Sequence, residues 1–295
     1  YHFLIVAVFL AFSGLSAVNT VIFVHGRSSG NNHCGWGTTD VNNYWGSSKD
    51  IEMNSWITSS SQRYFVGYHG DSDPRSWSGY SDCGYGARDN LDYIVATRCD
   101  SSVGNYCKII CHSAGCYAVD TYLSANVGYY TYAGSGYGTI QSKHLTGITY
   151  VMALSSASGG SELADSADWW GVDGSPMTLS LRVGVARGAG MHDSTRGIAV
   201  KHLMGDPSWD MGSGILPGED DGAVAFHSGC GLNSASDVST CSTGTKWSGH
   251  SNWYASTSLG QHNTSVGGYQ WAQSAHNHWT NSYGGTAFEA NHSDM

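Results

Sequence analysis

A short apolar segment that runs into a serine turn constrains this chain more than any other stretch. Residues 108–111 read Lys-Ile-Ile-Cys, which is typical of a short buried strand, and His-Ser-Ala-Gly follows directly. A helical pattern begins at once, because apolar side chains recur at spacings of three and four, at Cys116, Val119, Tyr122 and Leu123. The stretch therefore predicts a strand, a sharp turn centred on Ser113, and a helix.

A strand, a sharp turn with a central serine and a helix form the context that a nucleophile elbow requires. Such a tight turn needs small neighbours, and Ala114 and Gly115 supply them. The N-terminus of the following helix also favours negative charge that develops near the serine. The usual elbow reads Gly-x-Ser-x-Gly, whereas Cys111 occupies the first position here. Ser113 is the candidate nucleophile, in a pattern with one departure.

Strands and helices alternate along the chain. Apolar runs predict strands over residues 21–24, 63–68, 148–154 and 198–204, and helices are expected over 87–98 and from the serine to about 126. This alternation predicts a mostly parallel central sheet with helices on both faces. The 295 residues show no linker-like change of composition, so one domain is expected over residues 18–295.

The N-terminal segment and the charge balance indicate secretion and exclude polyanion partners. Residues 3–12 are almost all apolar and small residues follow, which is the size of a signal-peptide core and too short to span a bilayer. We expect a signal peptide over residues 1–17; a buried N-terminal strand is the alternative. The formal net charge is −10 and no basic stripe is present, so nucleic acid is not an expected partner.

Eight cysteines agree with passage through an oxidising compartment. Short loops between cysteines predict bridges that pair Cys230 with Cys241 and Cys99 with Cys107, and Cys34 with Cys83 is the next candidate pair. Cys111 and Cys116 flank the serine turn and are expected to be buried thiols that are not joined to each other. No Cys-x-x-Cys motif occurs, so a zinc or redox centre is not expected.

Four motifs in order make the chain similar to α/β-hydrolases, and within that superfamily to bacterial triacylglycerol lipases and esterases. Residues 24–27 (Val-His-Gly-Arg) resemble the turn from strand to oxyanion loop, and residues 112–115 resemble the elbow. Residues 160–165 (Gly-Ser-Glu-Leu-Ala-Asp) resemble the family's Arg-Gly-Ser-x-x-Ala-Asp stretch, which follows the strand after the elbow, and Gly159 stands in place of its arginine. Residues 219–224 resemble the turn that carries the family's acid. The resemblance covers roughly residues 21–255 and is patchy over 31–61 and 166–196.

The resemblance implies a Ser-His-Asp triad. The acid is Asp221, directly before a glycine, with Asp220 as the second candidate. In this fold the histidine follows the acid. His250 lies where a loop leads into a helix and is the first choice, His262 is the second, and His227 is too close to the acid turn to leave room for a strand.

The same resemblance supplies the oxyanion hole, formed by the backbone N–H groups of Arg27 and Ala114. Family lipases often hold a structural calcium ion, but Asn252 stands where an aspartate usually contributes. Asp206 and Asp210 could supply oxygens, so calcium is left open and no other cofactor is expected. His25 and His112, each before its turn, are interpreted as hydrogen-bonded structural histidines.

These features predict a secreted serine ester hydrolase, similar to a lipase or esterase, that acts on small-molecule or lipid esters through a covalent acyl-enzyme. Residues 166–196 are a candidate lid-like insertion that would allow transient contact with a lipid interface; their apolar side chains are Trp169, Trp170, Met177, Leu179 and Leu181. No protein partner is inferred. The alternative is a non-catalytic extracellular binding or adhesion protein on the same fold, suggested by the surface rich in tyrosine, tryptophan and glycine.

Overall fold

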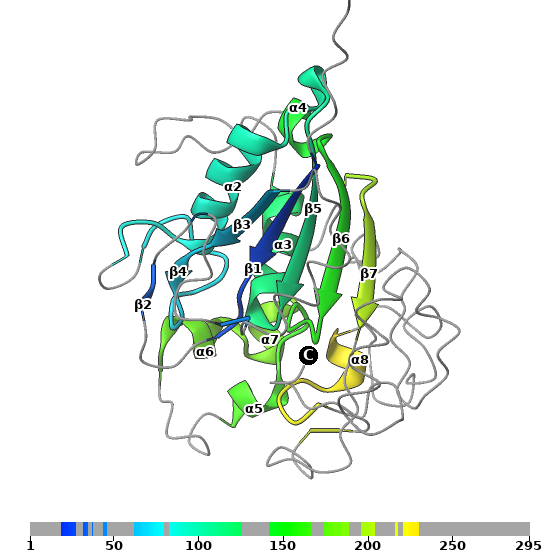
Figure 1. Cartoon of the computed structure of the whole chain (residues 1–295). Helices are drawn as coiled ribbons and strands as arrows, with labels where there is room; N and C mark the ends of the chain where they lie inside the picture. Colours follow the sequence, from blue (N-terminus) through cyan, green and yellow to red (C-terminus); the bar gives the residue numbers. More distant parts are fainter. Residues whose placement is uncertain are drawn as a thin grey trace, which may run out of the picture.

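Five parallel strands form the central sheet of the computed structural model (Figure 1). The structure describes residues 19–27, 32–34, 37, 44–45, 62–79, 83–125, 142–166, 174–188, 196–203, 216–217 and 221–229. In sheet order β3-β1-β5-β6-β7, the strands are β3 (Gln62–Val66), β1 (Asn19–Val24), β5 (Tyr106–His112), β6 (Ile148–Leu154) and β7 (Ala199–Leu203). The predicted strands are thus confirmed to within two residues at each end.

The strand order reverses at β1, and this reversal decides where a site can form. The chain first places β3 on one side of β1 and then returns to place β5 on the other side. Val24 at the end of β1 pairs with Cys111 near the end of β5, so the loops that follow the two strands leave the sheet together. In open parallel sheets, ligands bind at such a switch point, outside the carboxyl ends of the strands.

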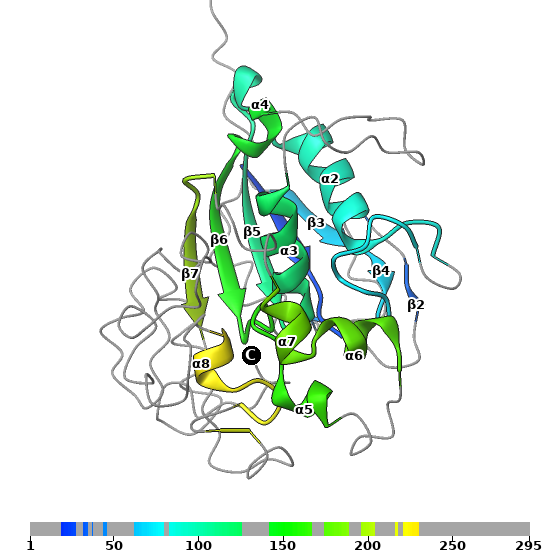
Figure 2. The ribbon, with the colours of Figure 1, turned by 180° about the vertical axis from the view of Figure 1, so that it is seen from behind.

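Helices α2 (Ala87–Arg98) and α3 (Ala114–Ser124) pack against each other and against β1, β3 and β5 (Figure 2). Their apolar faces meet the side chains of one sheet face, which include Ile22, Ile109 and Val151, in a single buried cluster. The expectation of a mostly parallel sheet with helices is confirmed. Within the described ranges, both long helices cover the same face. On the other face, aromatic side chains pack together.

Those aromatic side chains are Phe23, Phe65 and Trp45. The ring of Phe23 stacks on Phe65 with centroids 4.9 Å apart, and it meets Trp45 edge-on at 5.3 Å. All three side chains are buried. They anchor the segment that contains residues 44 and 45 close to the carboxyl end of β1.

Short elements occupy the two ends of the sheet. They are η2 (Ser101–Val103), α4 (Ser142–Leu145), α5 (Glu162–Asp165), α6 (Pro176–Ser180), α7 (Val183–Ala186), α8 (Phe226–Gly229), and the antiparallel pair β2 (Asn32–His33) and β4 (Tyr68–His69). Helix α4 lies at the amino ends of the strands, whereas α5 to α8 lie at the carboxyl ends (Figures 1 and 2). Of the helices described, none is long and apolar enough to cross a bilayer.

The expected lid-like insertion over residues 166–196 is not confirmed. Within it, residues 174–188 contain α6 and α7. Met177 and Leu181 were expected to belong to a lid over the serine, but both are buried in the main core. Leu179 is exposed, as is Val185 on α7. Trp169 and Trp170 lie outside the described residues, as does the expected signal peptide over residues 1–17.

The disulfides confirm two predictions and correct one. Cys99 is bonded to Cys107, as the short loop between them predicted, and Cys34 is bonded to Cys83, the next candidate pair. The expectation that Cys111 and Cys116 are separate thiols is wrong, because they are bonded to each other. The turn at Ser113 folds the first turn of α3 back beside the end of β5, which brings their Cα atoms to 4.8 Å. The predicted pair Cys230–Cys241 lies outside the described residues.

Candidate active site

Ser113 forms a sharp turn between β5 and α3 and has the backbone conformation of a nucleophile elbow. Its φ of 55° and ψ of −130° lie where residues other than glycine are rarely found, a strain of about 1–3 kcal/mol. Hydrogen bonds on both sides of the turn hold it: the Ser113 N–H donates to Leu154 O at 3.0 Å, and the Ala157 N–H donates to Ser113 O at 3.1 Å. The turn is therefore held by the loop that follows β6.

The loop after β1 packs directly on this turn, and two glycines make the close approach feasible. A Cβ on Gly26 would lie 2.5 Å from the Ser113 Cβ, and a Cβ on Gly115 would lie 2.3 Å from His25 O. Neither position has room for a larger residue. The interlocking places residues 25–27 against the serine, where the backbone N–H of Arg27 is a candidate oxyanion donor.

The second candidate donor is the backbone N–H of Ala114, the first residue of α3. N–H groups in the first turn of a helix have no acceptor within the helix, and the helix dipole makes that end favourable for negative charge. The side chain of Arg27 also ties the loop after β1 to the turn after β4. Its Nε lies 3.8 Å from Asp71 Oδ1, which is an ion pair and not a hydrogen bond.

Tyr44 connects the loop after β1 to the elbow, which sequence reasoning missed. Its hydroxyl accepts a hydrogen bond from the Gly26 N–H at 2.8 Å and lies 2.6 Å from Nδ1 of His112. Tyr44 is 68 residues from His112 in sequence and lies in a stretch with no clear periodicity, so no local pattern could indicate this contact. One phenol group therefore links the residues immediately before Arg27 and immediately before Ser113.

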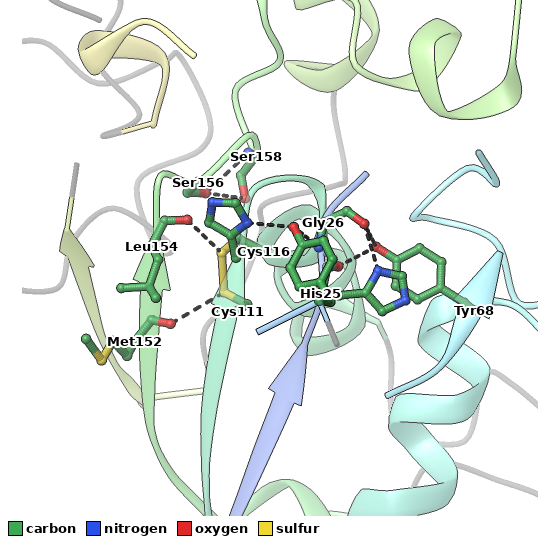
Figure 3. Close-up of a disulfide and its surroundings, with 11 residues drawn as sticks. His25, Gly26, Tyr68, Cys111, Cys116, Met152, Leu154, Ser156 and Ser158 are labelled. Atoms are coloured by element: carbon green, nitrogen blue, oxygen red, sulfur yellow. Dashed lines mark hydrogen bonds between the residues drawn. A yellow bond between two sulfur atoms is a disulfide. The ribbon is translucent and has the colours of Figure 1, made fainter. Parts of the chain in front are cut away.

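His25 packs into the base of the same loop (Figure 3). Its ring stacks on Tyr68 with centroids 4.0 Å apart, and the Tyr68 hydroxyl donates to His25 O at 2.5 Å. Burial raises the pKa of Tyr68 well above its ordinary value, so this hydroxyl stays protonated and remains a donor. His25 and His112 are both buried and hydrogen-bonded, as the structural interpretation of these histidines expected.

Asp221 is fully buried in a tight turn whose shape depends on Gly222, at a φ of 90°. One carboxylate oxygen, Oδ1, accepts from the N–H groups of Ala223 at 3.0 Å and Val224 at 2.8 Å. Hydrogen bonds to the charged form favour the carboxylate. The second candidate acid, Asp220, lies outside the described residues.

The loop after β6 connects the Asp221 turn to the elbow. Ser161 begins α5 and its hydroxyl donates to Ala223 O at 2.5 Å. A few residues earlier, Ala157 donates to the Ser113 carbonyl oxygen. These contacts place the acid turn and the serine at the same carboxyl edge of the sheet. The motif at residues 160–165 thus contacts the acid turn.

A cluster of three polar side chains supports this junction: His227 is buried, and Glu162 and Arg187 are half-buried. Glu162 Oε1 lies 3.3 Å from Nε2 of His227 and 3.9 Å from the Arg187 guanidinium. Burial alone raises the pKa of Glu162, but the hydrogen bond with His227 and the nearby positive charges outweigh it and lower that pKa. Arg187 also donates to Gly159 O at 3.1 Å, so a distant segment supplies a guanidinium where the motif lacked its arginine.

The candidate histidine is the part of the triad that the described residues do not include. His250 and His262 both lie outside them. Of the predicted site, the structure describes the candidate nucleophile Ser113, the candidate oxyanion donors and the candidate acid Asp221. His227 is among the described residues, and its Nε2 lies 3.3 Å from Glu162 Oε1. The calcium candidates Asp206 and Asp210 also lie outside, as does Asn252, which stands where an aspartate usually contributes. Among the described residues, no group of three or more side chains could hold a metal ion.

No protein-family model matches the chain, and a search of curated proteins also finds no match. Solved structures are similar at low identity. Bacillus licheniformis lipase BlEst2 in its mature form has a TM-score of 0.47 at 18% identity, over 72% of this chain and 80% of that one. Staphylococcus hyicus lipase has a TM-score of 0.45 at 13% identity, also over 72% and 80%. Phospholipase PlaB from Legionella pneumophila has a TM-score of 0.45 at 14% identity, over 72% of this chain and 45% of that one.

The topology itself carries the fold assignment. A parallel sheet reverses its strand order beside the elbow strand, a serine turn leads into a helix, and an aspartate turn follows β7 at the same edge. This is the α/β-hydrolase fold.

Proposed function

We propose that this protein is a secreted serine ester hydrolase, with Ser113 as nucleophile. The observation that carries the proposal is the strained Ser113 turn, which the loop after β1 approaches closely enough to require glycine at Gly26. Backbone strain of this kind persists only where surrounding structure maintains it, and it is concentrated at functional sites. A purely structural turn would have no need for a strained serine at the switch point of the sheet.

The chemistry that this arrangement supports is acyl transfer. The Ser113 hydroxyl attacks an ester carbonyl while a histidine accepts its proton, and the alcohol leaves with that proton as the acyl-enzyme forms. Water then hydrolyses the acyl-enzyme by the same route. The N–H groups of Arg27 and Ala114 would bind the oxyanion, and one such donor typically supplies about 3–4 kcal/mol of transition-state stabilisation.

We assign the proton acceptor to His250 and its orienting acid to Asp221. The backbone N–H groups of Ala223 and Val224 donate to the buried Asp221 carboxylate, and hydrogen bonds of this kind favour the ionised form against the cost of burial. Its role is to hold the imidazole tautomer that accepts from serine and to stabilise the imidazolium. Other histidines after residue 227, His262 first among them, are the competitors for the role of His250.

Three disulfides among the described residues support secretion, because such bonds persist in oxidising compartments. The exposed apolar side chains of Leu179 and Val185 lie on α6 and α7, at the end of the sheet that carries the serine. They favour a substrate with an apolar acyl group and transient contact with a lipid interface.

A fluorophosphonate probe tests the proposal, because it labels an activated serine and does not label an inert one. Wild-type protein and a Ser76→Ala control, in which an exposed hydroxyl is removed, should label and should hydrolyse an aryl ester. Ser113→Ala should abolish labelling and lower kcat by about 10⁴-fold or more while the protein stays folded. A folded wild-type protein that neither labels nor hydrolyses esters would instead favour the non-catalytic binding protein.

A further inference from the structure

The disulfide between Cys111 and Cys116 encloses Ser113. Cys111 lies two residues before the serine on β5, and Cys116 lies three residues after it on α3. Both cysteines are fully buried. The bond therefore closes a small covalent ring that contains the turn at Ser113.

The bridge packs between the elbow and the neighbouring strand β6 (Figure 3). The Cys111 sulfur lies 3.6 Å from Met152 O, and the Cys116 sulfur lies 3.9 Å from Leu154 O. A disulfide sulfur carries no hydrogen, so these are packing contacts and not hydrogen bonds. The sulfur pair thus fills the space at the point where an elbow usually has a glycine.

Relaxation of the strained turn would change the angle at which α3 leaves β5. The Ser113 backbone has a φ of 55°, and a return to an ordinary conformation would move Cys116 away from Cys111. Within the described residues, this bond is the one covalent link between β5 and α3 apart from the chain itself. It therefore opposes the motion that would displace the serine.

We propose that the Cys111–Cys116 disulfide is a positioning element that holds Ser113 in its reactive orientation. The inference rests on the proposed function, because it assigns the bond a role in presenting the nucleophile. Neither cysteine touches the reacting atoms in this scheme. Their effect passes through the backbone of the serine, so loss of the bond should lower kcat far more than it changes KM.

Two double variants separate positioning from stability. Cys111→Ala/Cys116→Ala removes the elbow bridge, and Cys99→Ala/Cys107→Ala removes a bridge of similar span, eight residues, between α2 and the start of β5. We expect the elbow variant to lose at least 10-fold in kcat and in its rate of fluorophosphonate labelling, with KM within 3-fold. The control variant should lose a similar amount of thermal stability and keep kcat within 3-fold, when both are assayed well below their Tm.

Equal kcat values in the elbow variant and the wild type would overturn the inference, as would equal losses of kcat in both variants. A test on the wild-type protein covers the case in which the elbow variant does not fold. Peptide mapping of the fluorophosphonate-labelled fraction should find Cys111 bonded to Cys116, and a labelled fraction with two free thiols there would also overturn it. Failure of the wild type to label at all would count against the proposed function instead.

Discussion

The serine turn and the acid turn differ in what closes them and in what holds them in place. The serine turn is part of one continuous stretch, residues 106–124, and a disulfide within that stretch closes it. The acid turn occupies residues 221–229 and is held by side chains from distant segments, among them Ser161, Glu162 and Arg187. The serine turn is thus closed by a covalent bond within its own stretch, in addition to its contacts with the loops after β1 and β6. The acid turn is closed by hydrogen bonds from its own backbone to Asp221, and distant side chains hold it in place.

The three described disulfides also differ in range: Cys34–Cys83 joins distant segments, whereas the other two close short loops. By a chain-entropy estimate, a bridge that spans 49 residues, such as Cys34–Cys83, stabilises the fold by about 4 kcal/mol, whereas one that spans five residues contributes about 2 kcal/mol. The elbow bridge is therefore the weaker source of overall stability. Its position around the serine, more than its contribution to the free energy of folding, distinguishes it.

After loss of the Ser113 hydroxyl itself, the largest expected effect on kcat is at the acid turn. Asp221→Asn should keep the turn, because an amide oxygen can still accept from Ala223 and Val224, but should lower kcat by about 10³–10⁴-fold since the imidazole loses its orienting charge. Ester hydrolysis under saturating substrate measures this. The neighbouring change Asp220→Asn is the control and should alter kcat by less than about 3-fold. The reverse ranking of the two variants would show that the acid is Asp220.

A smaller effect is expected where the loop after β1 meets the elbow. Tyr44→Phe removes the hydroxyl that joins the Gly26 N–H to His112, and one such hydrogen bond corresponds to about 10-fold or less in rate. We expect kcat to fall by about 5- to 10-fold with little change in KM. Tyr64→Phe removes the hydroxyl of a buried tyrosine on β3 and should leave kcat unchanged. A fall in both variants, or in neither, would contradict a role for Tyr44 in holding the loop.

The smallest effect on activity is expected behind the elbow, where Asp92 on α2 accepts from the Tyr122 hydroxyl on α3 at 2.8 Å. Burial raises the pKa of Asp92 to about 6, although the Tyr122 hydrogen bond opposes this shift. Between the unfolded pKa, near 4, and about 6, the folded state binds more protons than the unfolded state, so this carboxyl lowers stability as pH rises.

Asp92→Asn should therefore increase the free energy of unfolding by about 1–3 kcal/mol above pH 6, and the gain should disappear below about pH 4. Thermal unfolding at pH 7.5 and pH 4 measures both points. Ester hydrolysis should be unchanged, because α3 keeps its contact through the amide. A loss of stability at pH 7.5 would show that the charged carboxylate is favoured in the folded protein.

Local patterns were sufficient for much of the fold. The helix over residues 87–98 and the strand over 148–154 have the predicted bounds, because each combines a clear hydrophobic pattern with a definite end. The strand, turn and helix around Ser113 were predictable for the same reason. The bond between Cys111 and Cys116 was not, since the sequence does not show how sharply α3 turns back beside β5.

The sequence by itself determined the elements and the residue types of the site: a serine between strand and helix, a glycine after β1, and an aspartate before a glycine. Only the tertiary structure decided which distant side chains hold them, as with Tyr44 at His112 and Arg187 at Glu162. Hydrophobic periodicity and turn residues are properties of neighbours in the chain. A contact across 68 residues depends on the order of the strands in the sheet, which places the ends of β1 and β5 side by side.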